Sequence, residues 1–484
     1  MKKNLVFIII YLTVIFAAAA VLRFYHLSFF EFKNDQLAAI FLGNQARQLH
    51  FLVTHGMNSG VGFDNPPFFI YLMGALTYFT NNPYLLSAFF TVLNLVVLLA
   101  AIVYFCAFMP LTYALLSVVL LAFSPAFTIY STNIWAQCSL PAVLIFFNIF
   151  FCKFIQEEKP VYFIILNLLA AISAQIHMSG FFLFPALLVA GFKYRQKIKK
   201  AHIFLILSLL FVMFFPYLYH IFAEGEKGAV FAYAGKGKDI PWNIFRSHIW
   251  MSSLDFFRSY FKRDFLPVLW HSSGIAGLIL YPLTFVIPAL FTGGFIFYIK
   301  FLAQGKRIFD RNNSAYPLPF QVSGFLVSVV TLGYLVFQVR TPLHYLIVLF
   351  PSYAVITAFC AFRFWKYKAV RAALVVSLLA TVFLLAAILH FLDRAGGHPV
   401  AYGPSYKMLS DLGDKVKLLS ERGEFCPELR LNLPKEGKFD EDAIRFILGR
   451  DYVCKNGQKQ LSINLNIVWD AQSMRYDYAL VNGE

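Results

Sequence analysis

The stretch LVFIIIYLTVIFAAAAVL (residues 5–22) and the stretch EFKNDQL that follows it (residues 31–37) decide the fold class of this chain. The first stretch carries no charge and is long enough to cross the hydrocarbon core of a bilayer as a helix. Asp35 therefore lies just beyond a first membrane span, where a carboxylate is easily hydrated. Further apolar segments and surface loops surround this position in the sequence, so we expect chemistry at a membrane face.

The composition of the chain also indicates a membrane protein. Of its 484 residues, 59% are hydrophobic and only 14% are charged, whereas about 25% are charged in a soluble domain. Such a chain cannot hide its apolar surface in a water-soluble core, so lipid must be its solvent. The formal charge of +16 would also suit a nucleic acid. In a polytopic protein, however, Lys and Arg collect in cytoplasmic loops and contact anionic head groups. We therefore expect membrane lipids as partners and no nucleic acid.

About eleven apolar runs predict transmembrane helices, so the expected fold class is an α-helical polytopic membrane protein. The runs are residues 5–22, 85–108, 111–129, 140–154, 161–176, 181–192, 203–222, 277–298, 320–339, 343–362 and 372–391. The shortest runs need flanking residues to reach the roughly 20 that a span requires. The run 68–79 is too short and too close to Pro66 and Pro67 to be counted. We expect it to form a helix that lies in the membrane interface.

The basic residues predict the orientation of the chain. Four groups fall on one side of the membrane if the helices alternate. These are Lys2 and Lys3; Lys193, Arg195, Lys197, Lys199 and Lys200; Lys300, Lys306, Arg307 and Arg311; and Arg363, Lys366, Lys368 and Arg371. Because such residues favour the cytoplasmic side, we expect a cytoplasmic N-terminus and, after an odd number of spans, an extracytoplasmic C-terminus. The first span is interpreted as an anchor in the cell membrane rather than a removed signal.

Three outer segments are long enough to carry a function. Residues 23–83 contain Asp35 and Asp64, and residues 223–273 are rich in aromatic and basic side chains, Arg258 among them. Charge density rises in the third segment, residues 396–484. We therefore expect a transmembrane domain at residues 1–395 and a small extracytoplasmic α/β domain at residues 396–484.

The third segment shows its own pattern of elements. Residues 406–419 and 441–448 indicate helices, and residues 461–468 alternate apolar and polar side chains as a strand does. Cys426 and Cys454 are the only cysteines in this segment. Because disulfides persist outside the cytoplasm, we expect these two to be bonded. No Cys and His residues have zinc-ligand spacing, so the sequence predicts no metal ligand.

Several motifs in roughly residues 1–360 resemble one family. An acid at the start of the first outer loop and a Pro-Pro pair before an interfacial helix come first. FSPAFTIY (residues 123–130) leads to NIWAQ (residues 133–137), AQIH (residues 174–177) follows, and RTPLHY (residues 340–345) precedes Pro351. In this order, and at one membrane face, the motifs resemble the polyprenol-phosphate-sugar-dependent glycosyltransferases of the protein O-mannosyltransferase type. These are integral-membrane enzymes of the glycosyltransferase C superfamily.

The resemblance implies an inverting transferase. It would move a sugar from a polyprenyl-phosphate donor to a lipid, glycan or protein acceptor on the extracytoplasmic face. A carboxylate suits the removal of the acceptor proton, and we assign this role to Asp35. Cations suit the departing phosphate. The residues that we expect to bind the donor phosphate or the substrate are Arg340, His344, Tyr345, His177, Gln137 and Arg258.

One departure from the family bears on cofactors. The family commonly has Asp-Glu at the start of the first loop, whereas here Asp35 precedes Gln36. The resemblance therefore does not extend to the second acid or to any help that it gives with a metal. No cofactor is assigned, and a divalent metal remains an alternative.

Other interpretations of the same residues remain open. Asp35 could be a hydrated loop acid or a helix cap, and His177 a satisfied interfacial histidine. Arg340 could extend from a span to the interface, and Arg258 could face lipid head groups. The rival functions are a transporter or flippase of a lipid-linked saccharide, a glycan ligase and a non-catalytic assembly subunit. Against transport, the spans show few buried charges and no matched pair of broken helices in two halves.

Overall fold

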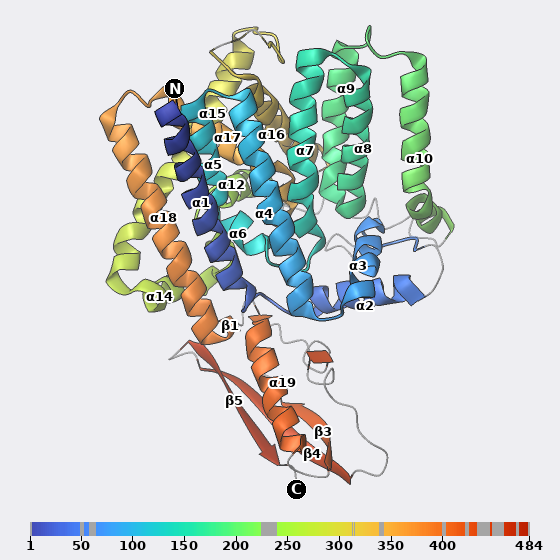
Figure 1. Cartoon of the computed structure of the whole chain (residues 1–484), viewed down its shortest axis with the longest axis vertical. Helices are drawn as coiled ribbons and strands as arrows, with labels where there is room; N and C mark the ends of the chain where they lie inside the picture. The colour runs from blue at the N-terminus through green and yellow to red at the C-terminus, as the bar shows by residue number, and fades with distance from the viewer. Residues whose placement is uncertain are drawn as a thin grey trace.

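The computed structural model is a helical bundle with a small sheet beyond one end (Figure 1). It describes residues 2–48, 53–57, 64–223, 240–311, 313, 315–337, 343–398, 403–421, 425–432, 446–447, 459–470 and 474–482. The helices up to the middle of the chain are α1 (Lys2–Leu27), α2 (Asn34–Gln48), α3 (Phe68–Phe79), α4 (Pro83–Phe108), α5 (Leu111–Ala122), α6 (Pro125–Tyr130), α7 (Ala136–Glu157), α8 (Pro160–Ile176), η1 (Met178–Phe182), α9 (Leu183–Lys193) and α10 (Lys200–Ala223).

The second half of the chain continues the bundle and adds the sheet. Its helices are α12 (Ile240–Met251), α13 (Phe256–Phe261), η3 (Lys262–Asp264), α14 (Phe265–Leu280), η4 (Tyr281–Phe285), α15 (Val286–Ala303), α16 (Leu318–Val336), η5 (Leu343–Leu349), α17 (Phe350–Arg363), α18 (Lys368–Ala395) and α19 (Tyr406–Glu421). Its strands are β1 (Gly397–His398), β2 (Gly403–Pro404), β3 (Phe425–Asn432), β4 (Lys459–Asp470) and β5 (Arg475–Asn482).

The predicted fold class is confirmed. In the part of the chain that the structure describes, eight helices are long and apolar enough to cross a membrane, and four shorter apolar helices accompany them. Three of the shorter helices, α5, α8 and η1–α9, coincide with predicted spans. The fourth is α3, which has the bounds expected for the interfacial helix. The count of eleven spans stays a prediction.

Three predicted spans are not single α-helices. The run 111–129 divides into α5 and α6, because Pro125 begins a new helix whose cap is Ser124. The run 277–298 begins in α14 and η4, and α15 starts only at Val286. The run 343–362 starts with the 3-10 helix η5 before α17. Apolar content alone predicts each of these runs as one membrane span, and it does not locate the helix breaks.

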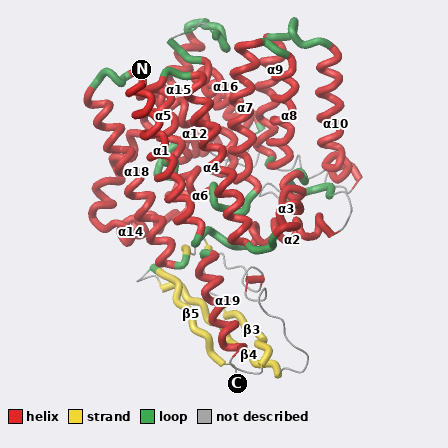
Figure 2. Tube along the Cα trace, in the orientation of Figure 1, coloured by secondary structure: helices red, strands yellow, loops and turns green. Residues whose placement is uncertain are grey.

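The two ends of the bundle differ. The N-terminus and the basic turns α9–α10 and α17–α18 lie at one end, and α2, α3 and the C-terminal sheet lie at the other (Figures 1 and 2). We call the second end the Asp35 end. The gathering of basic turns at the opposite end follows the predicted alternation of helices. The side of the membrane that each end faces stays a prediction.

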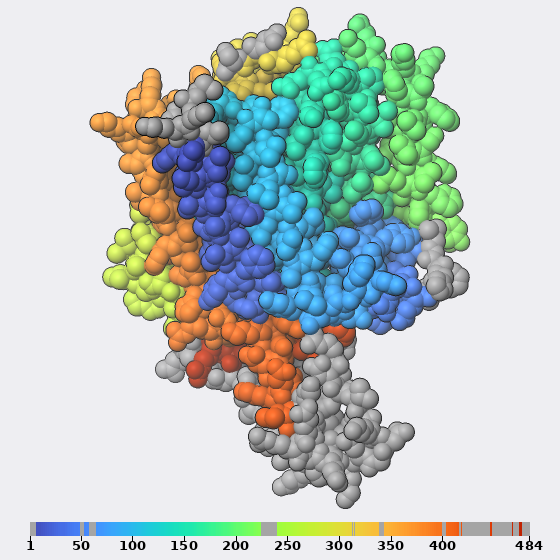
Figure 3. Space-filling model, in the orientation of Figure 1, coloured from blue at the N-terminus to red at the C-terminus, as the bar shows by residue number. Residues whose placement is uncertain are grey.

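The C-terminal elements include a three-stranded sheet. β3 pairs with β4 in parallel, and β4 pairs with β5 antiparallel. The predicted helix at 406–419 and strand at 461–468 are confirmed as α19 and β4. Of the predicted helix at 441–448, Phe446 and Ile447 are described and helical. Figure 3 shows the segment around α19 projecting from the body of the bundle.

Two predictions about this segment stay predictions. α18 ends at Ala395, next to the proposed boundary between residues 395 and 396, but the division into two domains is not thereby established. Cys426 belongs to β3, whereas Cys454 lies outside the described residues. The disulfide between them therefore remains an expectation.

The segment before α2 is held by the segment before α19. The backbone N–H of Tyr406 donates to Phe30 O at 2.9 Å, and that of Phe32 donates to Pro404 O at 3.4 Å. The rings of Phe30 and Tyr406 are stacked with their centroids 5.2 Å apart. We call these contacts the 30–32/403–406 junction. Asp35 lies three residues after this junction in the sequence, so the junction holds the segment that leads into α2.

Candidate functional site

The end of α1 is fixed against the polar turn that follows α6. The buried Arg23 donates from Nη1 to Ala19 O and Ala122 O, both at 3.0 Å. Nδ1 of His26 lies 2.6 Å from Oγ1 of Thr132. A buried polar group is stable only with such partners. These contacts bring the start of the first outer loop to residues 131–137, where the polar family-like motif lies.

Asp35 lies in the first turn of α2, where a carboxylate is favoured by the helix dipole. It is partly buried, and no other described residue shares a hydrogen bond or ion pair with its carboxylate. The neighbouring Gln36 is buried, and its Oε1 accepts the backbone N–H of Lys33 at 3.1 Å. Gln36 therefore stabilises the start of the helix.

A second carboxylate precedes Asp35. Glu31 is 2% exposed and forms an ion pair with Lys33. Its charge also acts on the hydroxyl groups of Tyr130 and Tyr260, which are hydrogen-bonded to each other. Sequence reasoning did not select Glu31. Its pairing with Lys33 favours a structural role, whereas the unpaired carboxylate of Asp35 is available to a substrate.

Four predicted substrate residues lie in or beside one aromatic cluster. The rings of His177 and Tyr345 are 4.9 Å apart, and those of His344 and Trp135 are 5.0 Å apart. His344 and Tyr345 come from η5, His177 caps η1, and Gln137 lies in the first turn of α7, which begins after Trp135. The cluster thus joins three elements that are distant in sequence.

The polar turn beside this cluster contains unsatisfied groups. Both amide atoms of Asn133 and Oε1 of Gln137 are buried, and none has a hydrogen-bond partner among the described residues. Buried polar atoms usually have a partner in the protein or in bound water. These atoms are therefore candidates for hydrogen bonds to a ligand or to bound water.

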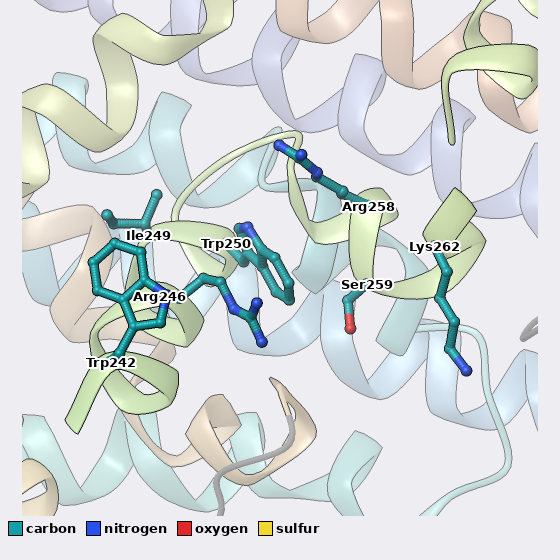
Figure 4. Close-up of a pocket in the computed structure, with 7 residues that line it drawn as sticks. All are labelled: Trp242, Arg246, Ile249, Trp250, Arg258, Ser259 and Lys262. Carbon is teal, nitrogen blue, oxygen red and sulfur yellow. The ribbon is translucent and has the colours of Figure 1, made fainter. Parts of the chain in front are cut away.

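The structure describes only one of the two predicted arginines. Arg340 lies outside the described residues. Arg258 belongs to α13 and lines a separate cavity together with Arg246 and Lys262 (Figure 4). Asp255, which precedes α13, accepts a hydrogen bond from Tyr281. Burial raises the pKa of Asp255, while that hydrogen bond and the Arg258 charge oppose the shift.

Three residues that the sequence did not single out as a group could hold a metal ion. His55 Nδ1 lies 3.0 Å and His220 Nε2 lies 3.6 Å from Oδ2 of Asp64. The three donor atoms all lie within 4.8 Å of one another. Two imidazoles and a carboxylate are a common donor set for zinc. The Tyr217 hydroxyl donates to Asp64 O at 2.8 Å and holds the backbone of this residue.

No local spacing could have revealed this cluster. His55 and Asp64 lie in the first outer loop, whereas His220 lies in the last turn of α10. The only sequence signal was their shared location in or beside segments predicted to be outside the cytoplasm. The fold therefore supplies the proximity that a motif search lacks.

Comparisons with known proteins agree with this architecture. Residues 64–220 match the family model of dolichyl-phosphate-mannose-protein mannosyltransferase. Among solved structures, ArnT from Cupriavidus metallidurans in the apo state is similar, with a TM-score of 0.53, 12% identity and 97% of each chain covered. ArnT from the same organism bound to undecaprenyl phosphate has a TM-score of 0.51, 11% identity and 97% of each chain covered. No curated protein sequence matches the chain.

The comparisons confirm the resemblance that the motifs predicted. The matched segment includes Gln137, His177 and two of the three possible metal ligands, Asp64 and His220. It does not include Asp35, His344 or Tyr345. The chain is therefore a multi-pass membrane protein with the ArnT fold, whose segment 64–220 is similar to the mannosyltransferase family. The roles of individual residues stay predictions.

Proposed function

We propose that this protein is an inverting glycosyltransferase. It takes a sugar from a polyprenyl-phosphate donor and transfers it to an acceptor on the extracytoplasmic face of the membrane. The observation that carries the proposal is the partly buried carboxylate of Asp35, which has no partner among the described residues. It follows a loop fixed against the unsatisfied polar atoms of Asn133 and Gln137. The family match and the ArnT fold support a lipid-phosphate donor.

The reaction is a single displacement. Asp35 accepts the proton of the acceptor hydroxyl while that oxygen attacks the anomeric carbon of the sugar. The bond from this carbon to the phosphate oxygen breaks, and polyprenyl phosphate leaves with the electron pair. Attack opposite the leaving group inverts the anomeric configuration. A positioned general base typically contributes about 10²–10⁴-fold to the rate.

The remaining predicted residues bind the donor. His177, His344 and Tyr345 offer ring edges and polar atoms, and Gln137 offers a buried amide oxygen that has no hydrogen-bond partner among the described residues. Arg340 and Arg258 supply positive charge for the phosphate, because the planar guanidinium matches two phosphate oxygens. The His55, Asp64 and His220 side chains have the donor set for a divalent ion, which would supply further positive charge at the Asp35 end.

Labelled donor turnover tests the proposal. Purified protein in liposomes receives a polyprenyl phosphate whose sugar carries a radioactive label, together with membranes that contain acceptors. We expect the radioactive label to leave the donor and to appear on an acceptor. NMR of the product should show that the anomeric configuration of the transferred sugar is inverted. Protein-free liposomes are the control. Movement of the intact donor across the bilayer would instead identify a transporter, and transfer of a whole lipid-linked glycan would identify a ligase.

A further inference from the structure

A basic cavity lies apart from the aromatic cluster. It has a volume of about 640 Å³ and opens between α12 and the α13–η3 segment (Figure 4). Its lining residues are Trp242, Arg246, Ile249, Trp250, Arg258, Ser259 and Lys262. We call it the Arg246 pocket. Its volume falls in the range of about 300–1,000 Å³ that is typical of sites for small ligands.

The charge of this pocket selects an anion. Among the described residues that line it, three side chains are cationic and none is a carboxylate. The guanidinium carbon of Arg246 lies 4.4 Å from the centroid of the Trp250 ring, and its Nε is buried without a hydrogen-bond partner among the described residues. Stacking on the indole orients the guanidinium. A buried donor without a partner favours a ligand that can accept its hydrogen bond.

The other two cations differ in their surroundings. Arg258 is exposed and lies near the carboxylate of Asp255, which offsets part of its charge. Lys262 is also exposed and has a φ of 48°, a conformation that residues other than glycine rarely adopt. Strained backbone conformations of this kind are concentrated at binding sites. The strained turn orients the lysine at the edge of the pocket.

The tryptophans suit the rest of the ligand. Trp242 is 62% exposed, and Trp250 is half-buried under Arg246. Flat indole rings provide apolar contact area and a polar N–H at one edge. A sugar ring has an apolar face of C–H groups and hydroxyls around its rim. Two indoles beside three cations therefore fit a saccharide that carries phosphate better than a bare inorganic ion.

The pocket is coupled to the proposed catalytic loop through α13. The Phe256 ring packs against Tyr130, with 5.3 Å between centroids, and Tyr260 shares a hydrogen bond with Tyr130. Glu31, which precedes Asp35 in the same loop, acts electrostatically on both tyrosines. The helix that carries Arg258 and Ser259 at the pocket thus contacts the surroundings of the first outer loop.

We infer that the Arg246 pocket binds the phosphorylated saccharide head group of a membrane lipid. This inference rests on the proposed function only where it treats the lipid as a reactant. Binding of the head group can be measured without turnover. Both the donor and a phosphorylated glycolipid acceptor present this chemistry. The experiment below separates the two sources.

Binding to the purified protein in phosphatidylcholine nanodiscs tests the inference. Intrinsic tryptophan fluorescence is measured with glucose 1-phosphate, glucose and inorganic phosphate, and then in nanodiscs that contain undecaprenyl phosphate. Glucose 1-phosphate should bind most tightly of the soluble probes, and its affinity should fall as salt rises. Displacement of glucose 1-phosphate by undecaprenyl phosphate would assign the pocket to the donor, as the role proposed for Arg258 requires. No displacement would assign the pocket to the phosphorylated acceptor and would remove Arg258 from the proposed donor site.

Two charge-removing variants decide the role of the pocket. Loss of a hydrogen bond to a charged group costs about 1.5–3 kcal/mol, so Arg246→Gln and Lys262→Gln should each weaken glucose 1-phosphate binding by roughly 10-fold or more. Lys366→Gln is the matched control. The Lys366 ammonium also lies over an aromatic ring, 5.0 Å from the centroid of Tyr367, but it belongs to a turn at the end of the bundle opposite Asp35. Lys262 is exposed, so its variant keeps the test valid if Arg246→Gln folds poorly.

The outcomes separate this inference from the proposed function. Unchanged glucose 1-phosphate affinity in a folded Lys262→Gln protein and in Arg246→Gln would overturn the inference even if sugar transfer proceeds normally. Equal affinity for glucose and glucose 1-phosphate would also overturn it. Binding that depends on both cations supports the inference even if no transfer is observed, in which case only the proposed function fails.

Discussion

At the scale of single residues, the two carboxylates of the first outer loop have different surroundings. Glu31 is buried and paired with Lys33, whereas Asp35 is partly buried and unpaired among the described residues. If Asp35 is the general base, Asp35→Asn keeps the size of the side chain but removes its ability to accept a proton. Turnover should fall by at least about 10²-fold. Donor binding and protein yield should change little, because Asp35 contributes little to packing.

Glu31→Gln is the informative comparison for this prediction. It removes the charge that the buried Glu31 contributes to the ion pair with the partly buried Lys33, so it should lower stability before it lowers the chemical rate. Thermal unfolding and turnover are measured for both variants. Near-normal turnover by a folded Asp35→Asn protein would show that the base lies elsewhere, with Asp64 the next acid to test.

The His55, Asp64 and His220 cluster makes a second prediction at this scale. Protein dialysed against a zinc salt and then against metal-free buffer should retain about one ion per chain, because three protein ligands are the usual number in an open zinc site. Asp64→Asn and His220→Ala should lose this ion, whereas His271→Ala, which changes a histidine outside the cluster, should keep it. Elemental analysis measures the content. Equal zinc in all variants would remove the cluster as the site.

Sequence reasoning reached some of these residues and not others. The sequence predicts Asp35 from its place after an apolar run together with the family resemblance, and it predicts His177, His344 and Tyr345 from the short motifs that carry this resemblance. The structure brings these three together because η1 and η5 pack side by side. The metal cluster escaped prediction because its ligands belong to no single motif. Proximity between α10 and the first loop depends on tertiary packing, which local patterns do not encode.

At the scale of elements, the 30–32/403–406 junction links the C-terminal segment to the start of α2. Tyr406 is 6% exposed and stacks on Phe30. Truncation of a buried aromatic residue to Ala costs about 3–5 kcal/mol, so Tyr406→Ala should release the segment before α2. We expect a lower kcat with little change in the donor KM, together with faster proteolysis after α18. Tyr406→Phe keeps the stacked ring and serves as the control.

The outcome distinguishes positioning from simple attachment. Faster proteolysis with unchanged kcat would mean that the junction holds the C-terminal segment without aligning Asp35.

The C-terminal segment also contains His398, whose ring is 5.0 Å from that of Phe261 and whose Nε2 is 3.7 Å from Oδ2 of Asp264. Burial lowers the pKa of His398 to about 4. This histidine is therefore neutral at pH 7 and adds a second contact between the C-terminal segment and η3.

The elements also show where hydropathy succeeds and fails. It located nearly every long helix, because lipid requires an apolar surface along the whole span. It could not locate the break at Pro125 or the η4 turn before α15, since the side chains on both sides of each break are apolar. Capping by Ser124 and the fixed φ of proline decide those ends. The capping serine and the proline are visible in the sequence, but they predict a helix break only if the apolar run is not assumed to be a single span.

At the scale of the whole molecule, the basic turns gather at the end opposite Asp35 (Figure 1). The turn between α9 and α10 and the turn between α17 and α18 both lie there, as does the N-terminus. A membrane potential and the positive-inside bias act on all of these groups together. The arrangement therefore favours one orientation, with the Asp35 end outside the cytoplasm.

Reporter fusions test this orientation. A reporter joined after Arg371, in the first turn of α18, should be cytoplasmic, and one joined at the C-terminus should be extracytoplasmic, because one further span separates them. Alkaline phosphatase, active only outside the cytoplasm, and a fluorescent protein that matures inside provide opposite signals at each position. Both reporters on the same side would contradict the crossing by α18 and the odd number of spans. Exchanged signals would instead keep the span and reverse the chain, placing Asp35 in the cytoplasm and removing the proposed extracytoplasmic transfer.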